Sequence, residues 1–141
     1  MNLSKELKDL ASDLTVLYVE DEDDTRSQIS QILKLFFKEV VVGINGKEAL
    51  ELYKQQDIDL VMTDLTMPIM DGLTMVKHIK HINHNQHVVV LTAHNSSDNL
   101  METINLQIDG FLLKPIKMDK MLELLHKVAH IINLEKNESK S

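Results

Sequence analysis

The sequence predicts an α/β domain built on a doubly wound, parallel, five-stranded sheet. Five short apolar runs rich in Val, Ile and Leu alternate with segments whose apolar side chains recur at helical spacing. The runs show little polar alternation, which is typical of strands covered on both faces. The length of 141 residues, 43% of them hydrophobic, suits one domain with a sizeable core.

The first half of the chain contains one additional helix and three predicted strands. Leucines at positions 3, 7, 10 and 14 form one face of a short amphipathic helix that ends near Ala11. The elements predicted after it are a strand at 14–19, a helix from Asp23 or Asp24 to about Phe37, a strand at 40–44, a helix at 47–56 and a strand at 60–63.

The second half begins with a turn, marked by Pro68 and the pair Asp71-Gly72. The elements predicted after it are a helix at 72–81, a strand at 88–91, a helix from Ser97 or Asp98 to about Leu106, a strand at 111–113 and a helix at 118–134. We therefore expect an N-terminal helical extension over 1–13, a main domain over 14–134, and a polar tail or start of a linker over 135–141.

Composition and charge exclude several classes of function. The net charge is -7, and the first 71 residues hold 15 acidic against 7 basic side chains. An acidic chain without a basic stripe is a poor candidate for direct nucleic acid binding. No apolar run approaches the roughly 20 residues of a membrane span, and the N-terminus lacks the apolar region of a signal peptide. With no Cys for disulfides, we expect a cytoplasmic location and no membrane partner.

Polar side chains follow four of the predicted strands. Glu20 and Asp21 come after the first strand, Asp64 after the third, Thr92 after the fourth and Lys114 after the fifth. The carboxyl ends of parallel strands form one edge of the sheet, where ligands bind. Carboxylates gathered at that edge repel one another unless they share a cation. A set of hard oxygen ligands suits Mg²⁺, which commonly binds phosphate oxygens as well.

This edge therefore suits phosphoryl chemistry. Asp64, central and next to a tight turn, is the natural nucleophile for forming an aspartyl phosphate. Lys114 and Thr92 supply a cation and a hydroxyl for the same phosphate oxygens. A simpler interpretation is that Asp64 only ends a strand and has no chemical role. It is less favoured because the polar residues at the other strand ends suit the same phosphoryl chemistry.

The order of these residues resembles the receiver domain of bacterial two-component response regulators, of the CheY-like type, over residues 14–134. Each matching fragment is weakly specific by itself, but all five in order, each at its proper strand end, are highly specific. The fragments are Val19-Glu20-Asp21-Glu22, Asn45-Gly46-Lys47-Glu48-Ala49-Leu50, Asp64-Leu65-Thr66-Met67-Pro68-Ile69-Met70-Asp71-Gly72, Leu91-Thr92-Ala93 and Asp109-Gly110-Phe111-Leu112-Leu113-Lys114-Pro115.

The resemblance implies a topology and a set of roles. The strands are expected in the order 2-1-3-4-5, with the N-terminal helix as an addition. Asp64 would accept a phosphoryl group from a sensor histidine kinase or a histidine phosphotransfer protein. Asp21 and Asp64 would bind Mg²⁺ directly, together with the backbone carbonyl of Thr66, and Glu20 would act through water. Lys114 would contact the phosphoryl oxygens, and its bond to the following proline is often cis in such domains.

The resemblance also implies a switch. Thr92 would move toward the phosphoryl group and Phe111 would move inward with it, which changes the surface formed by the last two helices and the strand between them. An output domain or target protein, not identified by the sequence, would read that change. The chain would catalyse only its own phosphorylation and dephosphorylation, and Thr66 and His94 would flank the path of the hydrolytic water. The N-terminal leucine stripe and the long last helix leave a homodimer open.

Some residues depart from the commoner pattern or suggest alternatives. Glu20 stands where Asp is commoner, and Phe111 where Tyr is commoner. A phosphatase of the haloacid-dehalogenase type also uses an aspartyl nucleophile and Mg²⁺, but it needs a second Asp where this chain has Thr66. A receiver-like interaction module that is never phosphorylated is a third possibility. His78 and His81 could share a helix face and bind a transition metal, but no carboxylate accompanies them, so a solvated surface is preferred.

Overall fold

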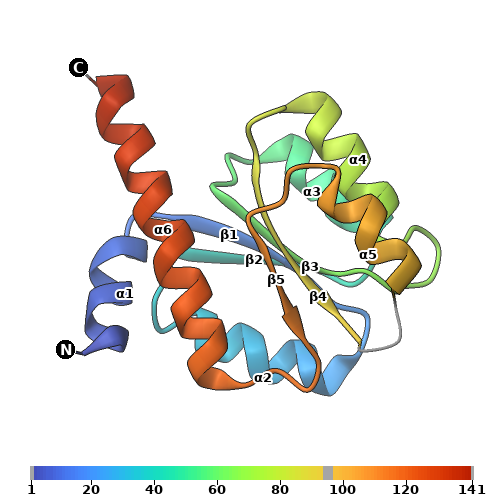
Figure 1. The fold of residues 1–141 in the computed structure, drawn as a ribbon, viewed down its shortest axis with the longest axis horizontal. Coiled ribbons are helices and arrows are strands. Elements are labelled where there is room, and N and C mark those ends of the chain that lie inside the picture. The colour runs from blue at the N-terminus through green and yellow to red at the C-terminus, as the bar shows by residue number, and fades with distance from the viewer. Residues whose placement is uncertain (1, 94–96, 141) are drawn as a thin grey trace.

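The structure is a computed structural model that describes residues 2–93 and 97–140. Its described part contains one sheet of five parallel strands in the order β2-β1-β3-β4-β5, which confirms the predicted topology (Figure 1). The strands are β1 Thr15–Val19, β2 Glu39–Gly43, β3 Leu60–Asp64, β4 His87–Thr92 and β5 Gly110–Leu113. The helices are α1 Leu3–Ala11, α2 Asp23–Leu33, α3 Gly46–Gln55, α4 Gly72–Ile82, α5 Ser97–Ile104 and α6 Met118–Lys140.

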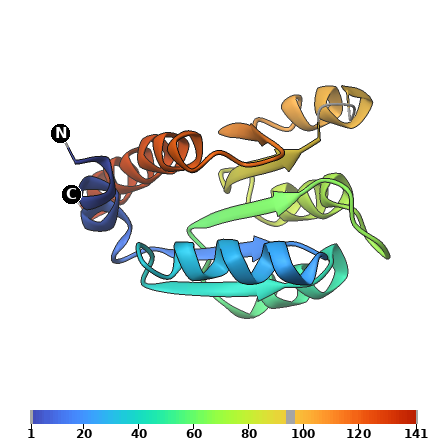
Figure 2. The same ribbon diagram turned by 90° about the horizontal axis from the view of Figure 1, so that it is seen from below.

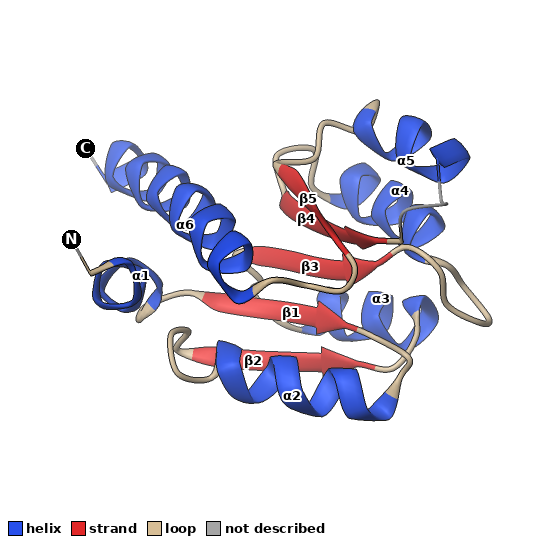
Figure 3. Cartoon of the chain, turned by 60° about the horizontal axis from the view of Figure 1, so that its bottom comes forward, coloured by secondary structure: helices blue, strands red, loops and turns tan. Residues whose placement is uncertain are grey.

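Helices cover both faces of the sheet, as the continuous apolar strands require (Figure 3). Residues of α1, α2 and α6 pack with one set of strand side chains into a first core cluster. Residues of α3 and α4 pack with the alternate set into a second cluster on the opposite face. β3 is the central strand of the five, and every one of its residues is buried. No helix within the described residues is long and apolar enough to cross a membrane.

The N-terminal helix α1 lies against α6, at the left of Figure 1 and again in Figure 2. Leu7 and Ala11 of α1 are fully buried in the first core cluster. The Asn133 amide of α6 donates a hydrogen bond of 2.7 Å to the Leu10 carbonyl. The leucine stripe predicted from the sequence therefore packs on its own domain in this structure.

Two helix ends differ from the prediction. Helix α2 ends at Leu33, not near Phe37, because the next turn tightens: Phe36 donates to the Leu33 carbonyl, three residues back. This turn places Phe37 in the core. Helix α6 continues past Leu134 to Lys140, so the stretch predicted to be a polar tail is helical. The division of the chain into 1–13, 14–134 and 135–141 stays a prediction.

The continuation of α6 is held by charged contacts to the amino-terminal edge of the sheet. Lys136 forms a 2.8 Å ion pair with Asp59, in the loop before β3. Glu135 lies 2.6 Å from His87 Nε2, and the other ring nitrogen of His87 lies 2.8 Å from Asp109. These contacts join α6 to the first residue of β4 and to the residue before β5. They explain why a segment without apolar periodicity stays on the domain.

Candidate functional site

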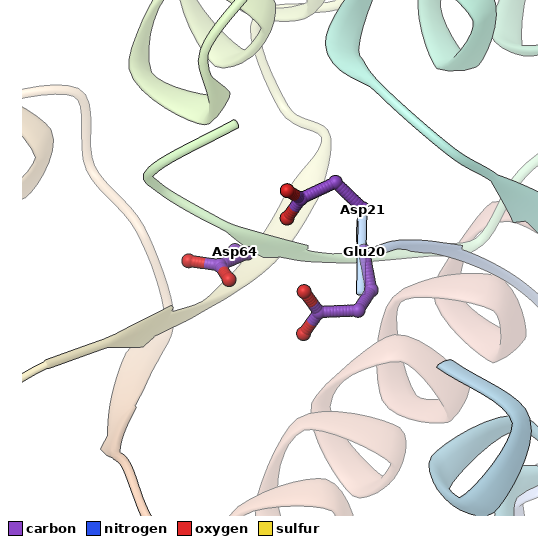
Figure 4. Close-up of side chains that lie close together, drawn as sticks. All are labelled: Glu20, Asp21 and Asp64. Carbon is purple, nitrogen blue, oxygen red and sulfur yellow. The ribbon is translucent and has the colours of Figure 1, made fainter. Parts of the chain in front are cut away.

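The carboxylates predicted to meet at the carboxyl edge of the sheet do meet there. Glu20 and Asp21 follow β1, and Asp64 is the last residue of β3. One oxygen atom of each carboxylate lies within 4.8 Å of the others, and Figure 4 shows the three side chains close together. Glu20 is 1% exposed and Asp64 is 7% exposed, whereas Asp21 is exposed to solvent. The edge therefore offers a concentrated negative charge that is open on the Asp21 side.

Lys114 completes this cluster from the loop after β5. Its Nζ donates a short hydrogen bond to Asp64 Oδ2 and a second, of 3.3 Å, to Glu20 Oε1. Burial by itself lowers the pKa of the Lys114 ammonium, but the bonds and charges of these carboxylates outweigh it and raise the pKa. Lys114 is therefore protonated and neutralises part of the charge. The peptide bond between Lys114 and Pro115 is cis.

Glu20 is the member of the cluster whose protonation is most altered. Burial of its carboxyl, followed by the nearby charge of Asp64, raises its pKa to about 7, although Lys114 acts in the opposite direction. Two residues before Glu20, on β1, Tyr18 is fully buried, and its hydroxyl has no hydrogen-bond partner among the described residues. Burial, with the charge of Glu20, raises the pKa of that phenol, so Tyr18 stays neutral.

The loop after β3 holds Asp64 in place through its backbone. The Thr66 amide donates to Asp64 Oδ1 at 3.2 Å, and the Gly72 amide donates to the Leu65 carbonyl at 2.9 Å. A side chain at position 72 would collide with the backbone carbonyl of Asp64, so only glycine allows this approach. Asp71 caps α4 by accepting a 2.8 Å hydrogen bond from the Thr74 amide. Any ligation by the Thr66 carbonyl stays a prediction.

Arg26 is a neighbour of the site that the sequence reasoning missed. It lies on α2, and its Nη1 donates to the backbone carbonyls of Glu20 at 3.0 Å and Asp21 at 3.3 Å. Its Nη2 pairs with Asp23 in the first turn of the helix. These bonds fix the backbone that carries two of the carboxylates. The sequence signal for this contact was a basic residue six positions after Glu20. Such a spacing does not show where a long side chain points.

The two predicted switch residues lie on adjacent strands. Thr92 ends β4, is 1% exposed, and its hydroxyl donates to the Ala93 carbonyl at 3.3 Å. Phe111 pairs with Val90 in the register of β4 and β5, so its side chain and that of Thr92 lie on the same face of the sheet. Phe111 is 43% exposed. Thr92 therefore lies next to the site, and Phe111 stands toward solvent.

The carboxylates fit a hard divalent cation. Three carboxylate groups offer oxygen ligands at one point, and among the described residues no other group of three or more His, Cys, Asp or Glu side chains gathers in this way. Among the described residues the Lys114 ammonium pairs with Glu20 and Asp64, which leaves the Asp21 carboxylate for a cation. His78 and His81, weighed above as ligands for a transition metal, belong to no such group. His94 lies outside the described residues.

Comparison with known proteins agrees with this architecture. The family model that describes the response regulator receiver domain matches residues 16–126 of this chain. The chemotaxis protein CheY of Bacillus subtilis is 35% identical over 116 residues, which cover 82% of this chain and 97% of that protein. The receiver domain of AraT, a response regulator from Geobacillus stearothermophilus, is 33% identical with a TM-score of 0.79, over 87% of this chain and 98% of that one.

A third comparison concerns a complex. A crystal structure of CheX with CheY, beryllofluoride and magnesium, from Borrelia burgdorferi, aligns with a TM-score of 0.78 and 27% identity, over 90% of this chain and 98% of that one. Receiver domains of this kind are signalling switches rather than enzymes that act on a separate substrate. Sequence match, topology and the acidic strand ends all agree, and the chain belongs to the response regulator receiver domain family.

Proposed function

We propose that this chain accepts a phosphoryl group on Asp64 from the phosphohistidine of a sensor histidine kinase or a histidine phosphotransfer protein. The observation that carries the proposal is the position of Asp64 on the central strand, beside Glu20 and Asp21 and in contact with Lys114. Asp64 shares its site with a cationic side chain and two further carboxylates, and that combination suits phosphate oxygens and a divalent cation.

The transfer uses the residues of the cluster in distinct roles. A carboxylate oxygen of Asp64 attacks the phosphorus, the P–N bond to the donor imidazole breaks, and the imidazole leaves with that electron pair and takes up a proton. Lys114 leaves its carboxylate partners to bind a phosphoryl oxygen. Mg²⁺ bound by Asp21, Asp64 and the Thr66 carbonyl, with Glu20 acting through water, would neutralise the charge on the phosphoryl oxygens.

The same step would operate the switch. The phosphoryl group on Asp64 attracts the Thr92 hydroxyl away from the Ala93 carbonyl, which it contacts at 3.3 Å. The movement of Thr92 makes room for Phe111, which turns from its exposed position toward the core. This shifts the population toward a second arrangement of the surface formed by α5, β5 and α6, which an output domain or target protein would read. Hydrolysis of the aspartyl phosphate would reset it.

The test is phosphorylation by a small donor. We expect wild-type protein incubated with acetyl phosphate and Mg²⁺ to gain one acid-labile phosphoryl group, measured by intact mass. The Asp64→Asn variant should gain none, because its amide is not a nucleophile at neutral pH. Asp57→Asn, which alters an exposed carboxylate near β3, is the matched control and should label like wild type. Equal labelling of Asp64→Asn and wild type would contradict the role of Asp64.

A further inference from the structure

One buried polar atom beside the carboxylate site has no role in the proposed function. Tyr18 of β1 is fully buried, and among the described residues its hydroxyl oxygen has no hydrogen-bond partner. A buried hydroxyl without a partner costs free energy, so such groups are uncommon in folded proteins. The second tyrosine shows the usual arrangement, because Tyr53 is also buried and its hydroxyl donates to Gln86 Oε1 at 2.7 Å. Within the part of the chain that the structure describes, the Tyr18 hydroxyl is therefore an unused donor.

The fold places this donor beside Glu20. The Glu20 amide donates to the Gly43 carbonyl at 3.1 Å, which continues the parallel pairing of β1 with β2. Side chains alternate along a strand, so Tyr18 and Glu20, two residues apart, are neighbours on the same face of the sheet. Among charged groups, Glu20 and then Asp64 act most strongly on the phenol. The unused donor and the Glu20 carboxylate therefore lie next to each other along β1.

Glu20 depends on Lys114 for one of its hydrogen bonds. The Glu20 side chain is 1% exposed, so protein donors must replace the water that its carboxylate has lost. Lys114 Nζ donates to Oε1 at 3.3 Å, and the Glu22 amide donates to Oε2 at 3.3 Å. In the proposed function, Lys114 leaves its carboxylate partners to bind a phosphoryl oxygen. Oε1 of Glu20 would then be a buried acceptor that has lost its donor.

We propose that Tyr18 is a positioning residue, a reserve hydrogen-bond donor that bonds to Glu20 Oε1 when Lys114 leaves it. Release by Lys114 allows the flexible side chain of Glu20 to turn toward the phenol, and the hydroxyl hydrogen rotates to meet it. A carboxylate offers about four lone-pair sites, so this bond is compatible with contact between Glu20 and Mg²⁺-bound water. The proposal rests on the proposed function in one respect: phosphorylation of Asp64 is what draws Lys114 away.

The alternative is that Tyr18 only fills space. Its ring belongs to the first core cluster, where the ring of Phe would serve equally well. The two interpretations differ in what the hydroxyl does after Lys114 leaves. Tyr18→Phe removes the hydroxyl and keeps the ring. Tyr53→Phe is the matched control, because it removes a hydroxyl that already has its hydrogen bond.

The first test uses no phosphoryl ligand. Urea unfolding compares Tyr18→Phe with its parent protein twice, in wild type and in the Lys114→Met background. We expect Tyr18→Phe not to lower the equilibrium constant of folding in wild type, because it removes no hydrogen bond. In the Lys114→Met background it should lower that constant on the order of tenfold, because Glu20 then loses its reserve donor. Tyr53→Phe should lower the constant by the same factor in both backgrounds.

The second test is spectroscopic. The chain has two tyrosines and no tryptophan, so in the Tyr53→Phe variant the near-ultraviolet tyrosine absorption comes from Tyr18 alone. A tyrosine hydroxyl that donates to a carboxylate absorbs at longer wavelength than one without a partner. We expect beryllofluoride with Mg²⁺ to shift the Tyr53→Phe spectrum to longer wavelength. Tyr18→Phe should weaken beryllofluoride binding, measured by calorimetry, on the order of tenfold, and Tyr53→Phe less than about twofold.

The outcomes separate the role of Tyr18 from the proposed function. Equal effects of Tyr18→Phe in the two backgrounds, or an unshifted spectrum when beryllofluoride binds, would overturn the role of Tyr18. Normal labelling of Asp64 alongside either result would keep the phosphoacceptor. Coupling between Tyr18 and Lys114 without any labelling of Asp64 by acetyl phosphate would support the reserve donor and refute the proposed function. If Lys114→Met does not fold, the spectrum alone decides.

Discussion

The contact between His87 and the end of α6 predicts a specific dependence of stability on pH. Both ring nitrogens of His87 face carboxylate oxygens, Asp109 at 2.8 Å and Glu135 at 2.6 Å. Only the doubly protonated ring can donate to both. The bond to Asp109, which outweighs the opposing effect of burial, and then the bond to Glu135 raise the pKa of His87 from 6.5 to about 9.

The size of the effect follows from that pKa. A change from 6.5 to about 9 corresponds to roughly 3 kcal/mol of stability. Glu135 is 58% exposed, so solvent weakens its part, and about 2 kcal/mol is the expected contribution. Unfolded protein loses the His87 proton near pH 6.5 and folded protein near pH 9. The contribution is therefore complete below pH 6.5 and disappears as the pH rises to 9.

The assay is urea unfolding of wild type and His87→Gln from pH 6 to pH 10, followed by circular dichroism. We expect wild type to be more stable by about 2 kcal/mol at pH 6 and by less than about 0.5 kcal/mol at pH 10. Taking the difference between the two proteins cancels the titration of Glu20. The matched control is His84→Gln, an exposed neighbour, which should follow wild type throughout. A gap that is constant with pH, or that widens as the pH rises, would refute the reasoning.

Two further predictions concern the carboxylate edge. Because burial and the charge of Asp64 raise the pKa of Glu20 to about 7, we expect Mg²⁺ affinity, measured by calorimetry, to rise about tenfold from pH 6 to pH 8. The Glu20→Gln variant should lose most of that rise. An unchanged rise in this variant would count against the role of Glu20. Gly72→Ala should lower the free energy of unfolding by about 3 kcal/mol, because its Cβ meets the rigid backbone of Asp64. Gly110→Ala, whose Cβ meets only the flexible end of Leu124, should cost about 1 kcal/mol in the same urea titration, and equal losses would contradict this explanation.

The order of residues along the chain was sufficient to predict the fold class and to predict which side chains gather at one edge of the sheet. The apolar runs are local patterns, and once they are read as parallel strands, topology forces their carboxyl ends to one edge. Asp64, Glu20 and Lys114 could therefore be predicted to meet, although Lys114 lies 94 residues from Glu20 in the chain. The ends of α2 and α6 could not be predicted in this way. Helix ends depend on tertiary contacts that periodicity does not contain.

The arrangement of charge within and around that edge depends on how the chain packs. The raised pKa of Glu20 arises from burial beside Asp64. The backbone of Glu20 is held by Arg26 from α2, and the spacing of these two residues in the sequence does not predict that contact. The contact of His87 with Glu135 joins residues 48 positions apart and holds α6 where a polar tail was expected. Such contacts depend on side-chain direction and solvent exclusion, which are properties of the packed chain and not of any local pattern.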